Sequence, residues 1–373
     1  MLTVEVLFWL SVLLVLYAYA GYPLLLALLA AVRPRPAYCA PIAPEITVVV
    51  PVHNQEKEIR RKIENLLSLD YPSDKMRVVI SSDGSTDGTD SAAREYAGRG
   101  VILVRSEERL GKVAAQNRAL QEAAGEIVVF TDSSILLNRE ALRAVVRPFA
   151  DEEVGCVSSE DDVPSGGEGA YVRYEMALRR LEGSVRTLIG VSGSFYAVRR
   201  SLCEATPIRY TRDFLVPLEV IRKGYRVVSE PAARGRFLPA PTSASEFRRK
   251  ARTVMRGMDV LWYRRDLLHP SRRPFVSWAL LSHKICRWLV PAALVLTYGL
   301  SAALAGREAY RSFFLLQTVL YLLPLVAWPI PSLHRSFPLK AVRFFLTTNA
   351  AVAAAWIRFL RGERAVIWEP TKR

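Results

Sequence analysis

Three long stretches without a charged residue constrain this chain more than any other feature of its sequence. They are residues Val6–Val32, Leu289–Gly306 and Ser312–Leu333. A helix needs about 20 apolar residues to cross a bilayer, so the first and third stretches are long enough and the second nearly so. The residues between the first and second stretches read as an ordinary soluble α/β domain, which is long enough to bury a core of its own.

The chain is therefore expected to have three parts. Residues 1–34 would form an N-terminal transmembrane anchor, residues 45–270 a soluble domain and residues 271–373 a C-terminal membrane region. The anchor could instead be a cleaved signal peptide. Its start is not basic, however, its apolar part exceeds the usual ~7–15 residues, and Arg33 and Arg35 follow it. These features favour an uncleaved anchor.

The membrane region is expected to hold an interface helix, two spans, and a third element that is either a span or an interfacial helix. The last candidate, Phe344–Ile357, has only 14 uncharged residues between Arg343 and Arg358, which favours an interfacial or re-entrant segment. Snorkelling arginines could still stretch it into a span. Basic residues at 33–35 and 248–287 place the soluble domain on the cytoplasmic side of a multi-pass protein of the cell (inner) membrane.

The charge and the cysteine content of the chain limit the classes of partner that it is expected to bind. The net charge is +15, and many basic residues cluster between Arg248 and Arg287. Such a cluster can bind nucleic acid, but the adjacent apolar stretches favour membrane lipids or a lipid-phosphate acceptor, with no nucleic-acid partner. Lys284 and Arg287 could meet a lipid phosphate or simply anchor the second span at the interface. The four cysteines are far apart and form no metal-binding spacing.

The soluble domain alternates between strand-like and helix-like segments from residue 46 to residue 131. Such alternation is typical of a parallel sheet with helices on both faces, whose ligands bind at the carboxyl ends of the strands. Two apolar runs stop there on a carboxylate, Arg77–Asp83 and Glu126–Asp132. Together they predict a site for a nucleotide and a divalent cation, Mg²⁺ or Mn²⁺.

Each candidate residue also has a structural alternative. Asp83 could accept hydrogen bonds from a nucleobase or ribose, or belong to an ordinary strand–helix turn. Lys112 opposes the helix dipole at a helix start, which favours a phosphate partner, although no P-loop motif is present. Asp132 could hold a cation or cap a helix near Asn138. Asp213 could be a general base or a helix cap.

Taken in order, these segments resemble family-2 glycosyltransferases, membrane-anchored enzymes that include the synthases of cellulose, chitin, hyaluronan and poly-N-acetylglucosamine. The similarity covers residues 45 to about 270. The matching segments are Pro51-Val-His-Asn-Gln-Glu56, Asp83-Gly-Ser-Thr-Asp-Gly-Thr89, Gly111-Lys112 with Ala115 and Asn117, Phe130-Thr-Asp-Ser-Ser134, Gly193–Arg200 and Arg212-Asp213. The resemblance implies an α/β domain of the GT-A fold, the Rossmann-like fold of nucleotide-diphospho-sugar transferases, flanked by transmembrane helices.

The resemblance also implies roles for individual residues. Asp213 would be the catalytic base of an inverting transfer. Asp132 would bind the metal ion, with Ser134 standing where the family has its second carboxylate. The donor, usually a UDP-sugar, would contact Pro51, His53, Asn54, Glu56, Asp83, Lys112 and Asp132. The acceptor side or a gating element would contain Gly193, Ser194, Arg249 and Arg252.

Three departures from the family pattern qualify these expectations. Ser134 replaces a metal-binding carboxylate, and Arg249-Lys-Ala-Arg252-Thr253 keeps only the arginine of the Gln-x-x-Arg-Trp motif of processive members. Arg212 stands where the family has an acidic partner of Asp213, and it could hold the base ionised.

The sequence thus predicts transfer of a sugar to a polysaccharide or lipid-linked acceptor, for exopolysaccharide or cell-envelope glycan synthesis. Partner proteins of polysaccharide synthesis or a homo-oligomer are possible assemblies. The alternatives are a single-addition glycolipid or polyprenyl-phosphate enzyme and a non-catalytic membrane scaffold with a degenerate GT-A domain.

Overall fold

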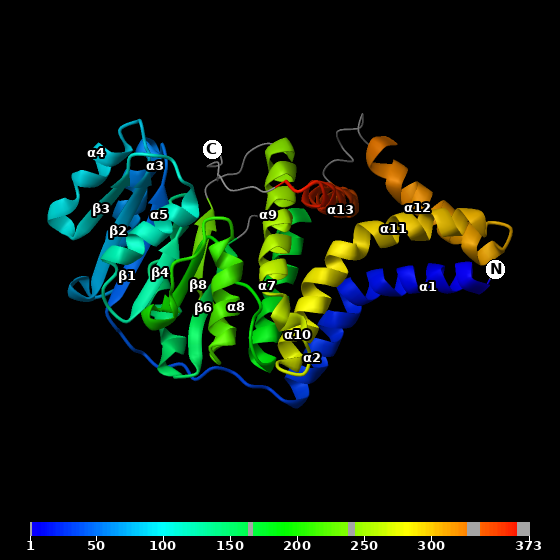
Figure 1. The fold of residues 1–373 in the computed structure, drawn as a ribbon, viewed down its shortest axis with the longest axis horizontal. Helices are drawn as coiled ribbons and strands as arrows, with labels where there is room; N and C mark the ends of the chain where they lie inside the picture. Colours follow the sequence, from blue (N-terminus) through cyan, green and yellow to red (C-terminus); the bar gives the residue numbers. More distant parts are fainter. Residues whose placement is uncertain (1, 163–166, 238–242, 327–335, 364–373) are drawn as a thin grey trace.

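The predicted strands form one mixed sheet. The computed structural model describes residues 2–162, 167–237, 243–326 and 336–363. The strands are β1 (Ile46–Val52), β2 (Met76–Asp83), β3 (Val101–Ser106), β4 (Ile127–Thr131), β5 (Ile135–Leu137), β6 (Val154–Asp162), β7 (Phe195–Arg199) and β8 (Arg226–Phe237). Their order across the sheet is β3-β2-β1-β4-β7-β6-β8-β5 (Figure 1).

The sheet has a parallel half and a mixed half. Strands β3, β2, β1 and β4 pair in parallel, as the alternation of segments predicts. Strand β7 pairs antiparallel with both β4 and β6, and β5 pairs antiparallel with β8. The chain order reverses direction between β1 and β4. A crevice opens at such a point beyond the carboxyl ends of the strands.

The central strands are uniformly apolar because helices cover both faces of the sheet. All seven residues of β1 and all five of β4 are buried, as expected for parallel strands inside an α/β domain. The helices are α1 (Leu2–Leu16), α2 (Tyr22–Val32), α3 (Glu56–Leu67), α4 (Thr89–Arg94), α5 (Lys112–Ala119), α6 (Ala141–Val146), α7 (Gly167–Val185), α8 (Arg212–Arg222), α9 (Ser243–Tyr263), α10 (Pro274–Ala279), α11 (Arg287–Ala303), α12 (Glu308–Val326) and α13 (Phe337–Leu360).

A helical arm projects from one side of the domain, with the N-terminus near its tip (Figure 1). Helices α1 and α11 lie side by side in it, and α12 packs on α11. Among the described residues, two continuous helical stretches are long and apolar enough to cross a membrane, Leu2–Val32 and Pro274–Ala303. The expected span Ser312–Leu333 lies partly outside the described residues.

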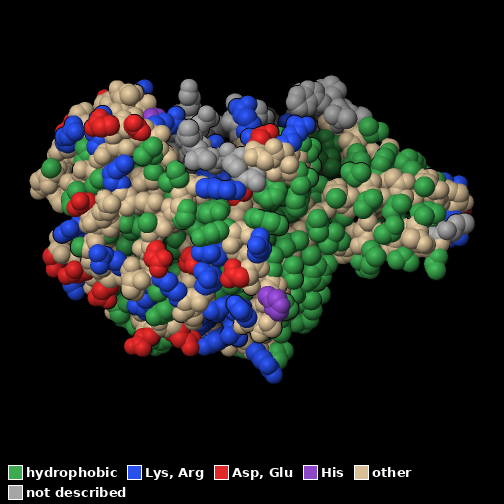
Figure 2. Space-filling model, in the orientation of Figure 1, with side chains coloured by type: hydrophobic (Ala, Val, Ile, Leu, Met, Phe, Trp, Pro, Cys, Tyr) green, Lys and Arg blue, Asp and Glu red, His purple; other side chains and the backbone are tan. Residues whose placement is uncertain are grey.

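The surface of the arm is apolar. Hydrophobic side chains cover it and continue over the adjoining edge of the domain, whereas charged side chains gather on the body (Figure 2). The exposed apolar residues include Leu13, Leu24, Leu28, Val295, Leu296, Leu316 and Val319. A contiguous apolar surface of this kind needs a membrane or a protein partner to cover it.

A buried ionic cluster joins the arm to the domain. His283 hydrogen-bonds Glu182 at 2.7 Å and Glu175 at 3.1 Å, and Tyr22 donates to Glu182 at 2.8 Å. Arg287 forms an ion pair with Glu175. The expectation that Arg287 meets a lipid phosphate is therefore wrong for this structure, because α7 supplies its anionic partner.

Helix α13 does not lie along the arm. It packs against α7, α9 and α11, and Figure 1 shows it nearly end-on while α1 and α11 lie in the plane of the picture. An orientation across the arm is the one that an interfacial helix needs, since the arm would point into the membrane.

Candidate active site

A cavity of about 410 Å³ lies beyond the carboxyl ends of β1 and β4. Its walls come from the end of β4, the start of α5, the segment before β7, the start of α8, and helices α7 and α9. The predicted site residues that line it are Pro51, Lys112, Asp132, Ser134, Gly193, Ser194, Asp213, Arg249 and Arg252. The structure thus brings together the expected metal, phosphate, acceptor and base positions.

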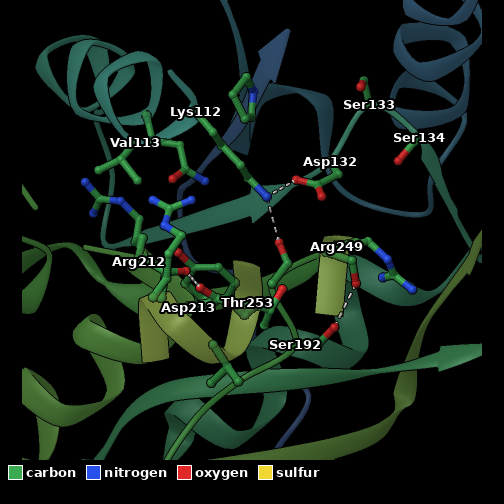
Figure 3. A pocket seen from close by; sticks show the side chains of 18 of the residues that line it. Lys112, Val113, Asp132, Ser133, Ser134, Ser192, Arg212, Asp213, Arg249 and Thr253 are labelled. Atoms are coloured by element: carbon green, nitrogen blue, oxygen red, sulfur yellow. Dashed lines mark hydrogen bonds and ion pairs between the residues drawn. The ribbon is translucent and has the colours of Figure 1, made fainter. Parts of the chain in front are cut away.

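Lys112 and Asp132 form the centre of this cavity. Lys112 is the first residue of α5, and its Nζ lies 2.5 Å from Oδ1 of Asp132 (Figure 3). The same ammonium donates to the carbonyl of Gly193 at 3.1 Å. Asp132 therefore pairs with a cation from α5 and does not cap the helix near Asn138. Lys112 opposes the helix dipole, and the carboxylate of Asp132 is its anionic partner.

The segment Ser192–Ser194 connects the two ends of the cavity. The backbone N–H of Asp132 donates to the carbonyl of Ser194 at 2.9 Å. A Cβ on Gly193 would lie 2.7 Å from Oδ2 of Asp213, so a side chain larger than hydrogen would push this carboxylate away. Glycine at this position lets the main chain approach both Lys112 and Asp213.

Asp213 stands in the first turn of α8 and accepts a hydrogen bond from Thr211. Its neighbour Arg212 does not face it. Arg212 bonds Asn117 and the carbonyl of Glu204 and lies over the ring of Phe130, 5.0 Å from the ring centroid. The guanidinium of Arg212 thus packs α5 against α8, and its expected action on the base stays a prediction.

Arg256, on α9, lies close enough to Asp213 for the charge of that carboxylate to act on it. Burial lowers the pKa of Arg256, and the carboxylate of Asp213 partly opposes that change. Arg256 lines the same cavity as Arg252, one turn away on α9, and Arg249, two turns away. No spacing in the sequence distinguished Arg256 from the other basic residues of this helix.

The cavity carries more positive than negative charge. Six basic side chains and three carboxylates line it: Lys112, Arg179, Arg212, Arg249, Arg252 and Arg256, against Asp132, Asp161 and Asp213. A concave, partly buried surface with this excess favours an anionic ligand such as a diphosphate.

Four predicted donor-binding residues do not line this cavity: His53, Asn54, Glu56 and Asp83. They hydrogen-bond the turn between β2 and α4 and its neighbours. Asn54 accepts from the N–H of Thr86 at 2.8 Å, and Glu56 accepts from the N–H of Gly88 at 3.2 Å. Asn54 has a φ of 49°, a left-handed conformation that asparagine tolerates better than most residues.

Asp83 has a clear structural partner. Its carboxylate accepts the backbone N–H groups of Leu110 at 2.8 Å and Gly111 at 2.7 Å, while its own carbonyl lies 2.7 Å from Nδ1 of His53. These two bonds hold the loop that immediately precedes Lys112. Asp83 therefore contributes to the cavity through the position of Lys112, and its direct contact with a nucleoside stays a prediction.

Lys62 belongs to none of the predicted motifs. It lies on α3, is fully buried, and donates to Oγ1 of Thr131 at 2.9 Å and to the carbonyl of Ile135 at 2.7 Å. Burial lowers its pKa to about 7, against the opposing charge of Asp132. The amine thus fastens both ends of the loop that carries Asp132. The only signal in the sequence was a lysine three residues after Ile59, on the apolar face of α3.

Metal binding would rest on few protein ligands. Among the described residues, no group of three or more His, Cys, Asp or Glu side chains could hold an ion. Asp132 offers one carboxylate, with the hydroxyl of Ser134 on the same loop lining the cavity. This set fits Mg²⁺ or Mn²⁺ where phosphate oxygens and water complete the coordination, as is common for Mg²⁺.

Comparisons with known proteins agree with this geometry. The model of the family "Glycosyl transferase family 2" matches residues 47–210. Glycosyltransferase AglE of Haloferax volcanii is 29% identical over 136 residues, which cover 35% of this chain and 44% of that protein. Poly-beta-1,6-N-acetyl-D-glucosamine synthase of Staphylococcus aureus is 24% identical over 234 residues, 58% of this chain and 55% of that protein. The chain thus spans about half the length of these relatives.

One solved structure is similar over nearly the whole chain. It is the mannosyltransferase PcManGT of Pyrobaculum calidifontis, in complex with GDP-Man and Mn²⁺. The TM-score is 0.74 at 26% sequence identity, and the match covers 96% of this chain and 99% of that one. This structural similarity confirms the predicted GT-A fold. The match to the family model confirms the predicted family resemblance.

Proposed function

We propose that this chain, whose residues 47–210 form a family-2 glycosyltransferase domain, is an inverting glycosyltransferase. It would move a sugar from a nucleotide-sugar donor to a polysaccharide or lipid-linked acceptor. The reaction would take place at the cytoplasmic face of the cell membrane, in the synthesis of exopolysaccharide or cell-envelope glycan. The resemblance favours a UDP-sugar, and the complex of PcManGT with GDP-Man makes a GDP-sugar the first alternative.

The observation that carries the proposal is the arrangement around Ser192–Ser194. Lys112 donates to the carbonyl of Gly193, and the backbone N–H of Asp132 donates to the carbonyl of Ser194. The Asp213 carboxylate lies where a side chain of residue 193 would otherwise stand. A leaving diphosphate needs positive charge, and an attacking hydroxyl needs a base. Both requirements are met within one cavity, around the main chain of Gly193.

Lys112 would bind the diphosphate of the donor. The ammonium already faces the cavity, and the arginines around it add to the positive potential. The charge that develops on the leaving oxygen would be stabilised by a group that is held in place before the reaction, because Asp132 and the Gly193 carbonyl fix the Nζ atom. Pro51 and the 53–56 loop would border the nucleoside.

A divalent cation would be held by Asp132, with Ser134 beside it. When bound, it would supply positive charge to the leaving diphosphate. Its binding has to compete with the ammonium of Lys112 for the carboxylate, since the two lie 2.5 Å apart. Metal affinity is therefore expected to be weak without donor and to depend on the phosphate oxygens.

Asp213 would remove the proton of the acceptor hydroxyl. The oxygen of that hydroxyl then attacks the anomeric carbon as the bond to the diphosphate oxygen breaks. The proton stays on Asp213 and the nucleoside diphosphate leaves. A single displacement inverts the anomeric centre. Gly193 keeps this carboxylate within reach because no side chain occupies the space next to Oδ2.

The acceptor would enter past α9. Arg249 and Arg252 line the cavity from this helix, which packs against α13 and so lies next to the proposed membrane face. In the described part of the chain the arm consists of α1, α11 and α12. Three helices are too few to enclose a polymer channel within one chain, which favours addition of one or a few sugars unless copies or partner proteins assemble.

The proposal is tested with the full chain purified in detergent. A panel of UDP- and GDP-sugars is supplied with Mn²⁺ or Mg²⁺, together with a membrane lipid extract as acceptor source, and released nucleoside diphosphate is measured. We expect release with one or a few donors. Asp213→Asn should reduce it by at least about 100-fold, as is typical for loss of a general base. Asp74→Asn, an exposed aspartate outside the cavity, is the matched control.

Two results would count against the proposal. Turnover that survives Asp213→Asn would remove the assignment of the base. Absence of donor binding by calorimetry at millimolar concentration would favour the non-catalytic scaffold, for which Ser134 in place of a carboxylate is the supporting feature.

A further inference from the structure

Asp161 is a carboxylate of the cavity that none of the predicted motifs contains. It is the penultimate residue of β6, the strand that pairs with β7 and β8. Oδ1 accepts hydrogen bonds from Ser194 at 2.7 Å and from Ser192 at 3.1 Å. The two serine hydroxyls lie 2.7 Å from each other. These contacts hold the carboxylate at the edge of the Ser192–Ser194 segment.

The two serines do not saturate this carboxylate. An ionised carboxyl group has about four acceptor positions, and Ser192 and Ser194 have one hydroxyl proton each, so together they fill at most two of these positions. Burial raises the pKa of Asp161, and the hydrogen bond from Ser194 and the charge of Arg179 only partly offset this effect. Asp161 is half-buried and lines the cavity, so its remaining acceptor positions can receive a donor from a ligand there.

Arg179 supplies the complementary chemistry. It projects from α7 and lines the same cavity. Within the described residues it makes no ion pair or hydrogen bond, so its five N–H groups are available to a ligand. A carboxylate and a guanidinium in one cavity suit a hydroxyl group, which donates its proton to the first and accepts from the second. A phosphate would suit Arg179 alone, because Asp161 would repel it.

The position of Asp161 favours the sugar that is transferred over the acceptor. The Gly193 carbonyl contacts Lys112, the Ser194 carbonyl contacts the N–H of Asp132, and Gly193 touches Asp213. A ring attached to the diphosphate and open to attack near Asp213 must therefore lie over this segment. Asp161 lies beside the same three residues.

We propose that Asp161, held by Ser192 and Ser194 and accompanied by Arg179, binds hydroxyl groups of the transferred sugar and so selects the nucleotide sugar. This inference rests on the proposed glycosyltransferase activity. It assigns recognition of the donor sugar to the end of β6. The residues proposed to bind the metal ion and the diphosphate, and the proposed base, are unchanged.

The test uses the full chain in detergent and the donor that the panel identifies as the best. The measured quantity is kcat/KM for that donor and for its monodeoxy analogues, by release of nucleoside diphosphate. For the wild-type chain we expect at least one analogue to be worse by about 10- to 100-fold, the loss of a hydrogen bond to a charged group. Asp161→Asn should lower kcat/KM for the parent donor by a similar factor while changing that analogue little.

Three further measurements make the result specific. Arg179→Met should reduce the same discrimination, and because Arg179 is only partly buried this variant should fold. Asp162→Asn, the exposed neighbour at the end of β6, should leave all donors unchanged. The inhibition constant of the nucleoside diphosphate alone should stay within about twofold in every variant, since it lacks the sugar.

Other outcomes would overturn the inference. If Asp161→Asn lowers kcat/KM for the parent donor and all analogues by the same factor, Asp161 does not read a hydroxyl group. If it weakens inhibition by the nucleoside diphosphate, it acts at the diphosphate end. A wild-type chain that is active but shows no preference among analogues contradicts this inference alone, whereas a wild-type chain without any activity contradicts the proposed function as well.

Discussion

The two sides of the crevice at the carboxyl ends of the strands use their polar residues differently. On the side of β1 and β2, His53, Asn54, Glu56 and Asp83 hydrogen-bond the neighbouring turns. On the side of β4, β6 and α8, Asp132, Asp161 and Asp213 line the cavity itself. The first group contains the most recognisable sequence motif, and the second contains the carboxylates that line the cavity.

This difference shows that a well-formed motif can act by positioning another residue. Asp83 accepts two backbone N–H groups of the loop before Lys112, so its effect on chemistry passes through that lysine. Asp132 and Asp213, in contrast, line the cavity with their own carboxylates. Substitutions on the side of β1 and β2 should therefore mainly lower stability, whereas substitutions on the side of β4, β6 and α8 should mainly lower turnover.

The largest effect is expected at Lys112. Lys112→Met removes the fixed ammonium from the diphosphate end, and kcat/KM should fall by about 100- to 1,000-fold. The same change frees the Asp132 carboxylate from its ion pair, so Mn²⁺ should bind more tightly to the donor-free protein, as measured by calorimetry. Lys57→Met, an exposed lysine on α3, should change neither quantity. Unchanged donor-free affinity would mean that the ammonium does not compete with the metal ion.

Asp83→Ala should act mainly on stability. It leaves the buried N–H of Gly111 and that of Leu110 without their acceptor, which costs about 3 kcal/mol. For a domain of this size the Tm should fall by roughly 5–10 °C, followed by tryptophan fluorescence. Turnover should fall less than in Lys112→Met. A normal Tm with a much higher KM for donor would instead show that Asp83 contacts the nucleoside directly.

Lys62→Met should change how stability depends on pH. The pKa of Lys62 is about 7 in the folded chain and about 10.4 when unfolded, so the unfolded chain holds more protons between these values. Stability of the wild type should therefore rise with pH above about 7, by about 2 kcal/mol up to pH 8.5. The variant should lack this rise.

Urea unfolding at pH 6.5, 7.5 and 8.5 measures the effect, with Lys57→Met as the control. Parallel stability curves for wild type and Lys62→Met would contradict the expectation. The loop of Asp132 also loses an anchor, so kcat of the variant should fall by about tenfold at a constant KM for acceptor.

The smallest effect is expected for Asn54→Gly. Glycine adopts the φ of 49° without strain, and water can replace the exposed amide in its bond to Thr86. Both Tm and kcat/KM should stay close to the wild-type values, with kcat/KM within about threefold. A tenfold rise in KM for the donor would show that Asn54 binds it, and would move this residue to the ligand-facing side of the comparison.

Much of the parallel half could be predicted because its signals are local. The alternation of strands and helices expected from residue 46 to residue 131 is present, and the runs Arg77–Asp83 and Glu126–Asp132 correspond to β2 and β4 with bounds that differ by one residue. Strand β6 was missed because its second half is Ser158-Ser-Glu-Asp-Asp162, which lacks the apolar character of a buried strand. The structure buries Ser158, Ser159 and Glu160 by pairing β6 with β7 and β8, and it leaves Asp161 half-buried and Asp162 exposed.

The sequence by itself determined the class of domain, its apolar helical extensions, and the positions of Lys112, Asp132 and Asp213 in the chain. These follow from periodicity and from motifs within a few residues of one another. Only the tertiary structure decided that Arg212 packs away from Asp213, that Lys62 fastens the Asp132 loop from inside the core, and that Asp161 joins the cavity. Each of these depends on contacts between segments 30 or more residues apart, whose pairing a single sequence does not display.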